Sequence, residues 1–338
     1  MSVNTTLSSS FPPRRAFARR ALVHAAAALL FLSSAAAAHD FWIQPATFEP
    51  ESGSLLAVQA LVGEHGVGKP VERHDDRIVR FVLVGQDWEQ PVVGRDGGLP
   101  AGLVRVASPD WRLGAAGAPL AGTLVLGFRT SHARIEIEPD KFGEYLRLEG
   151  LEPVLALRAE RGESGQPATE AYSRCAKALV DVRPAGGAAD EPAKAGAGDR
   201  ALGFTLELIA EQDPFLLRDA AGAARGAPAG ELEPLTVRLL FEDQPLTGAL
   251  VRATALVHAP RDDDPVVPFG APLPEPLRVR TDEAGRAELR LPHRGEWLLT
   301  AVHMRPAPAD ITDVTDVEWE SFWASLTFAV PEGPPARP

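Results

Sequence analysis

Short apolar segments separated by turn residues dominate the sequence and predict a β-rich protein. After residue 38, apolar segments that are alternating or continuous recur at short intervals, and glycine, proline or polar residues bound most of them. The polar residues 129–132 indicate that the two strands flanking them pair with each other. We expect strands at residues 41–45, 54–63, 77–84, 122–128, 133–137, 170–182, 201–210, 234–241, 248–257, 277–281, 287–291, 297–303 and 324–330.

One segment has a helical pattern. Between residues 140 and 158 the apolar residues recur at spacings of three and four, and helix formers dominate. Pro139 followed by Asp140 is a start signal, with Asp140 as the candidate N-cap. Gly150 and Pro153 predict that the segment divides into two short helices.

A segment rich in alanine, glycine and proline separates the strands into two groups. We predict two β-sandwich domains at residues 39–183 and 200–332, joined by a linker at 184–199. The helical segment 140–158 is then an insertion in the first domain. The 31 prolines and 30 glycines support a mostly β fold with many turns over a helical bundle.

Residues 1–38 have the features of a secretory signal peptide. Four arginines precede an apolar stretch too short to span a bilayer, and Ala36 and Ala38 satisfy the rule for cleavage after Ala38. An uncleaved membrane anchor is the alternative. Two adjacent arginines also resemble the twin-arginine signal that exports folded proteins. We therefore expect a periplasmic bacterial protein with no membrane insertion after cleavage.

Composition limits the partners of the mature chain. The signal segment holds four arginines and no acidic residue, so its loss changes the formal charge from −12 to −16. Such a surface repels nucleic acid, and we expect no nucleic-acid partner. The single cysteine, Cys175, excludes an intramolecular disulfide. Because Cys175 lies in an apolar segment, we interpret it as a buried structural thiol, with a soft metal ligand as the alternative.

Cleavage after Ala38 would also create a chelating group. His39 would carry a free α-amine, with a pKa of about 8, beside its imidazole. Together they form a chelate that suits copper or nickel. His65 follows the end of one predicted strand and His303 ends another. We therefore predict that His39, His65 and His303 bind Ni(II) or Co(II), with Cu(II) as the alternative ion. The competing interpretation is that these are ordinary loop or sheet-edge histidines.

The other polar residues are weaker candidates. His74 stands beside two aspartates and could support a metal site, but a solvated acidic turn is the better explanation. The acidic segments 262–264 and 310–320 match no EF-hand spacing, and we expect solvated loops, with weak calcium binding as the alternative. No Ser/His/Asp arrangement or nucleophile elbow is present. We therefore expect a binding protein, not an enzyme.

Six segments in a fixed order carry a resemblance to a known family. They are residues 39–45 (HDFWIQP), 62–65 (VGEH), 141–155, 172–178 (YSRCAKA), 297–304 (WLLTAVHM) and 320–326 (ESFWASL). On these segments the chain resembles the DUF4198 family of periplasmic bacterial proteins, often described as nickel- or cobalt-uptake components. The resemblance implies a role in transition-metal import, with an inner-membrane metal transporter as a partner.

Two further segments, Leu246–Val251 and Thr281–Arg286, resemble the immunoglobulin- or transthyretin-like β-sandwich of exported bacterial proteins. We extend that fold class to both predicted domains. Taken together, we expect an exported transition-metal-binding protein that acts in metal uptake or handling. Two alternatives stay open. One is a non-metal ligand-binding or adhesion module of immunoglobulin-like domains, and the other is a copper redox protein with an N-terminal histidine brace.

Overall fold

The structure is a computed structural model of the chain. A compact unit begins at His39, the residue that the predicted cleavage would make the first. Four parts of the sequence considered for function lie outside the described residues: the predicted signal peptide, most of the predicted linker, His258 and the acidic segment 262–264. The structure describes residues 1, 39–108, 120–185, 198–219, 232–257 and 275–331.

The fold is mostly β, as the sequence predicted. The strands are β1 (Asp40–Pro45), β2 (Leu55–Glu64), β3 (Val67–Val71), β4 (Ile78–Val84), β5 (Glu89–Pro91), β6 (Gly102–Arg105), β7 (Gly122–Thr130), β8 (Ala133–Ile137), β9 (Ala168–Val182), β10 (Leu206–Ala210), β11 (Leu235–Phe241), β12 (Gln244–Pro245), β13 (Leu250–Ala255), β14 (Leu277–Arg280), β15 (Arg286–Leu289), β16 (Gly295–Pro306) and β17 (Trp319–Val330). The α-helices are α2 (Pro139–Leu148) and α3 (Glu152–Glu160), and two 3-10 turns are η1 (Asp75–Arg77) and η3 (Pro214–Leu216). Within the described ranges, no helix is long and apolar enough to cross a membrane.

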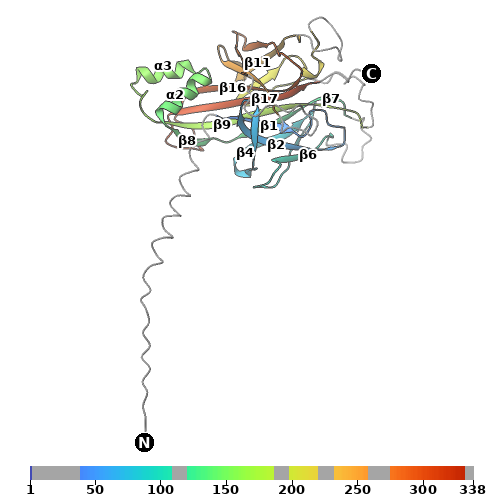
Figure 1. Cartoon of the computed structure of the whole chain (residues 1–338), viewed down its shortest axis with the longest axis horizontal. Helices are drawn as coiled ribbons and strands as arrows, with labels where there is room; N and C mark the ends of the chain where they lie inside the picture. Colours follow the sequence, from blue (N-terminus) through green and yellow to red (C-terminus); the bar gives the residue numbers. More distant parts are fainter. Residues whose placement is uncertain (2–38, 109–119, 186–197, 220–231, 258–274, 332–338) are drawn as a thin grey trace. The chain divides into compact units, whose positions relative to one another are not determined.

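The strands form three sheets. The central sheet has the order β14-β13-β16-β17-β9-β7-β4-β5, with β8 also paired to β9. The N-terminal sheet has the order β1-β2-β3, with β6 on β2, and the C-terminal sheet has the order β10-β11-β12, with β15 on β11. Helices α2 and α3 lie at one end of the central sheet (Figure 1).

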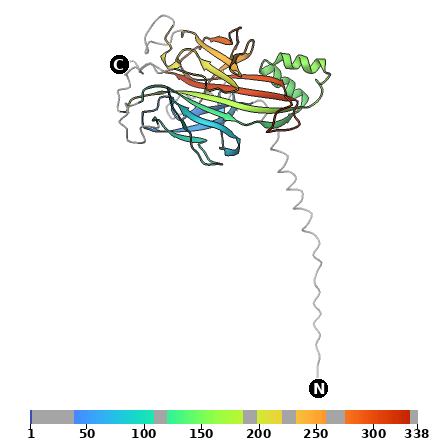
Figure 2. The same ribbon diagram turned by 180° about the vertical axis from the view of Figure 1, so that it is seen from behind.

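The central sheet separates two hydrophobic cores. Along β9, Cys175 and Leu179 belong to the core shared with the C-terminal sheet, whereas Ala176, Ala178 and Val180 belong to the core shared with the N-terminal sheet. A strand buried on both faces is typically rich in apolar residues, and from Cys175 to Val182 every residue of β9 except Lys177 and Asp181 is apolar. The result is three layers of sheet, with the central one covered on both sides (Figures 1 and 2).

Strands from both halves of the sequence share the central sheet. Strand β9, which precedes the predicted linker, pairs in parallel with β17 near the C-terminus, from Glu170 opposite Trp319 to Ala178 opposite Thr327. Two hydrophobic cores lie on the two faces of the central sheet. However, residues 39–183 and 200–332 are not separate bodies, because this one sheet forms a wall of both cores.

Three local predictions need correction. Strands β7 and β8 do not pair with each other, because the long β9 offers its edge to both in succession. Helix α2 begins at Pro139 with Glu138 as N-cap, so Asp140 lies within the helix. Strand β17 starts at Trp319, within the segment expected to be an acidic loop. The division into two helices is confirmed, and Gly150, at φ +68°, follows the end of α2.

A buried lysine connects the central sheet to the chain that enters β10. The ammonium of Lys177 lies 2.7 Å from Asp199 and 3.1 Å from Glu207, and all three side chains are at most 1% exposed. It also donates to the carbonyl oxygens of Arg200 and Leu208. The two carboxylates accept backbone N–H groups in turn, so every charge in the cluster has partners.

Replacing Lys177 by methionine is expected to destabilise the protein by about 3–5 kcal/mol, because two buried carboxylates lose their counter-ion. Denaturant unfolding monitored by tryptophan fluorescence measures the change. Lys141→Met is the matched control, since the Lys141 side chain is 76% exposed and its ion pair with Glu144 lies at the surface. Equal stability of the two variants would show that Lys177 does not hold the layers together.

Candidate functional site

His39 lies directly before β1, at one end of the N-terminal sheet. Asp40 is paired with Gly63, so His39 is placed beside Glu64. The imidazole Nδ1 of His39 is 3.0 Å from Oε1 of Glu64. That nitrogen is buried, yet it makes no hydrogen bond of acceptable geometry with any described residue. A ring nitrogen that lies beside a carboxylate and makes no aligned hydrogen bond is a candidate metal ligand.

His65 occupies the turn between β2 and β3, at the same end of the sheet. Both turn residues have positive φ, +52° for His65 and +75° for Gly66, which is the pattern of a two-residue type I′ turn. A Cβ on Gly66 would lie 2.1 Å from the carbonyl oxygen of Ala255, so glycine is required there. The turn fixes the exposed His65 next to Glu64. The structure therefore brings His39 and His65 to one end of one sheet.

A buried ion cluster anchors the start of β1. The Arg252 Nη2 atom lies 2.6 Å from Oδ1 of Asp40 and 2.9 Å from Oε1 of Glu149. Burial raises the pKa of Asp40 above its ordinary value and that of Glu149 to about 7, although Arg252 acts in the opposite direction. The residue after His39 is therefore held by Arg252 of β13, and Glu149, which follows α2, shares that arginine.

His303 is not brought to the other two histidines. It lies on β16, with its ring centroid 4.3 Å from that of Phe241 on β11 of the C-terminal sheet. Leu298, one of the β16 residues that face the other way, packs instead against Trp42 of β1. Burial, followed by the charge of Arg305, lowers the pKa of His303 to about 4, so its imidazole is neutral at pH 7. His303 and His39 thus belong to opposite faces of the central sheet.

The remaining metal candidates lie apart from this end of the sheet. Cys175 is buried, as the sequence predicted, and burial raises the pKa of its thiol to about 11. His293 contacts the carbonyl oxygen of Arg294 and packs on Trp297. Across the part of the chain that the structure describes, no three His, Cys, Asp or Glu side chains are grouped to hold a metal ion.

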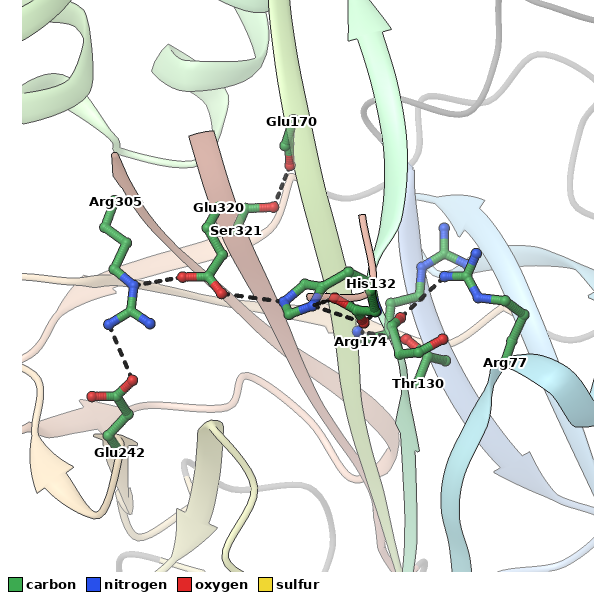
Figure 3. A network of polar contacts seen from close by, with 11 residues as sticks. Arg77, Thr130, His132, Glu170, Arg174, Glu242, Arg305, Glu320 and Ser321 are labelled. Carbon is green, nitrogen blue, oxygen red and sulfur yellow. Dashed lines mark hydrogen bonds and ion pairs between the residues drawn. The ribbon is translucent and has the colours of Figure 1, made fainter. Parts of the chain in front are cut away.

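A second polar cluster surrounds His132, which follows β7. Its Nδ1 lies 2.9 Å from Asp313, and its Nε2 lies 3.3 Å from Oε1 of the buried Glu320. Arg305 donates to the other oxygen of Glu320 and also pairs with Glu242. Figure 3 shows this chain of side chains from Glu242 to His132. Both nitrogens of His132 face carboxylates, so the residue ties the 310–318 loop to the central sheet. Its buried Nε2 makes no hydrogen bond of acceptable geometry with a described residue.

Glu170 stands beside this cluster, in the interior near α2. The hydroxyl groups of Tyr145 and Ser321 both donate to its Oε1 (Figure 3 draws the contact with Ser321). Burial is the main effect on this carboxyl and raises its pKa from 4.5 to about 7, although the hydrogen bonds favour the ionised form. The folded protein therefore keeps Glu170 protonated in a pH range where the unfolded chain ionises it.

Stability is consequently expected to decrease as pH rises from about 4.5 through 7, because a carboxyl with a raised pKa stabilises the fold only while it is protonated. The Glu170 contribution is about 3 kcal/mol. Glu170→Gln keeps an acceptor oxygen but cannot ionise, so its denaturation midpoint should fall less between pH about 5 and 9 than that of the wild type. Glu160→Gln, on the exposed end of α3, is the control. Identical pH profiles for all three proteins would contradict the assignment.

Comparison with known proteins agrees with the resemblance drawn from the sequence. The model of the family described as "Domain of unknown function (DUF4198)" matches residues 36–305. A search of curated proteins gives no match. The matched region includes β1, the His65 turn, both helices and all but the last residue of β16. Since the match spans most of the chain, the protein belongs to the DUF4198 family.

Proposed function

We propose that this is an exported, periplasmic protein that binds a transition-metal ion at the mature N-terminus, in metal uptake or handling. The supporting observation is the buried Nδ1 of His39, which lies 3.0 Å from Glu64 without a hydrogen bond. Two ligands at neighbouring positions of one tetragonal ion lie about 2.9 Å apart, because each bond is about 2 Å long. The spacing of these two atoms therefore fits a shared ion.

The α-amine of His39 supplies the further donor. In the uncleaved chain this nitrogen belongs to an amide and cannot bind the ion, whereas cleavage after Ala38 frees it. The compact unit begins at His39, which supports cleavage at that point. Amine, imidazole and the Glu64 carboxylate then form a three-donor set, and the exposed His65 in the adjacent turn is the fourth candidate. His303 takes no part in this proposal.

Nitrogen ligands in this number suit Ni(II), Co(II) and Cu(II). The Irving–Williams order places Cu(II) first in affinity, so selectivity for nickel or cobalt would depend on geometry or supply. An inner-membrane metal transporter is the proposed partner. Tight and exclusive Cu(II) binding with redox activity would favour the histidine-brace alternative.

Isothermal titration of the chain beginning at His39 with Ni(II), Co(II) and Cu(II) tests the proposal. We expect one site with a Kd below about 100 μM for at least one ion. A chain that begins at Ala38 is the sharpest comparison, because it keeps every side chain and only moves the amine by one residue. We expect it to bind at least about tenfold more weakly, a loss of about 1.4 kcal/mol.

Substitutions separate the ligands from the other histidines. His39→Ala should abolish binding, Glu64→Gln and His65→Ala should weaken it, and His303→Ala should leave it unchanged. Equal affinity of the chains beginning at Ala38 and His39, or no binding tighter than about 100 μM, would exclude the N-terminal site.

A further inference from the structure

A cavity of about 170 Å³ lies between the N-terminal sheet and the part of the central sheet that holds β4, β7 and β9. One water molecule needs roughly 10–15 Å³ by this measure, so the space is at least ten times larger. The exposed residues Glu72 and His74 are among its lining residues, which places its mouth at the surface. Its apolar lining comes from Phe41, Ala60, Val71, Ile78, Ala101 and Phe128.

Two arginines lining this cavity have no acidic partner. The Arg174 guanidinium lies over the rings of Phe41 and Tyr172, with its central carbon 4.7 and 5.2 Å from their centroids. Aromatic faces attract the flat side of a guanidinium but satisfy none of its five N–H donors. Among the described residues, no carboxylate lies within ion-pair distance of Arg174 or Arg77, and no acceptor is within hydrogen-bond distance of the Arg174 guanidinium.

Arg77 is in a similar position. One of its terminal nitrogens donates to the carbonyl oxygen of Ser131, whereas its buried Nε has no hydrogen-bond partner in the described structure. The third arginine of the lining, Arg73, differs because it pairs with Asp75 and donates to two backbone carbonyls. Figure 3 shows Arg77 and Thr130 beside His132, at the edge of the polar cluster.

Neighbouring cations without counter-ions are unfavourable in a protein interior. Burial is the main effect on Arg174 and lowers its pKa, Tyr172 acts in the opposite direction, and the nearby charge of Arg77 lowers the pKa further. In a chain with a formal charge of −12, carboxylates are abundant, yet Glu72, the acidic residue of the lining, makes no ion pair with either arginine among the described residues. A bound anion would supply the missing counter-charge and the missing acceptors.

We propose that this cavity binds a small organic carboxylate, with its carboxylate group on Arg174 and Arg77 and its apolar body over Phe41 and Phe128. The planar guanidinium fork matches a carboxylate in two parallel hydrogen bonds. The apolar half of the lining does not favour a fully hydrated anion such as inorganic phosphate, because phosphate would leave these apolar side chains uncovered. The cavity uses none of the residues proposed to bind the metal ion, so the two sites are tested separately.

Benzoate is the probe, and benzamide, which has the same shape without the charge, is its control. Isothermal titration of the metal-free chain beginning at His39 should show benzoate binding, with benzamide and inorganic phosphate at least about tenfold weaker. Arg174→Gln should reduce benzoate affinity by about tenfold or more, and Arg77→Gln should also reduce it. Arg95→Gln changes the same charge at an exposed position and should have no effect.

Thermal unfolding without ligand separates a binding role from a structural one. Because Arg174 lacks an acidic partner, Arg174→Gln should unfold at the same temperature as the wild type or higher, and benzoate should no longer raise that temperature. Three titration results would overturn the proposal: no benzoate binding, phosphate binding as tight as that of benzoate, or benzoate binding that neither Arg174→Gln nor Arg77→Gln weakens. A large loss of stability in the ligand-free Arg174→Gln protein would also overturn it.

Discussion

Strand β9 imposes the constraint on which the rest of the structure depends, because both its faces and both its edges are covered. Strands β7 and β8 share one edge and β17 takes the other, which satisfies the buried backbone groups along most of its length. Each covered face is one wall of a hydrophobic core. Two of the polar side chains that β9 buries, Lys177 and Glu170, need specific polar partners. These come from the C-terminal half of the sequence and from α2, so neither half completes its core alone.

The same arrangement gives the N-terminal end of the sheet its fixed position. Asp40 is held by Arg252, a residue more than two hundred positions later, and Glu149 shares that arginine. Residues next to a chain end ordinarily fray, and the proposed cleavage would place Asp40 next to one. Here the buried ion cluster immediately follows His39, and the type I′ turn at His65 and Gly66 stands alongside. Preorganisation of this kind is what a small chelating site requires, since the ion need not order the chain that binds it.

Local pattern predicted the long strands and the two helices, because apolar periodicity and the Gly150 and Pro153 signals act within a few residues. It did not predict pairing, since the edge that β8 joins depends on the length of β9. Strand β16 shows a second limit. Residues 297–302 are almost entirely apolar, so no alternation indicates which face each side chain takes, and His303 was placed with the wrong neighbours. The carboxylate partners of His132 lie in the distant 310–320 segment. Whether Arg174 has an acidic partner depends on which carboxylates the fold places near it. Neither property has a sequence signal.

The buried thiol of Cys175 has a consequence for following this protein in solution. It is the only cysteine in the sequence, and it lies within the section of β9 that is covered on both faces and both edges. A thiol reagent can therefore reach it only while the central sheet is open, and burial also disfavours the reactive thiolate. The rate of alkylation under native conditions therefore reports how often the central sheet opens around this residue. Mass spectrometry can measure that rate without an introduced label.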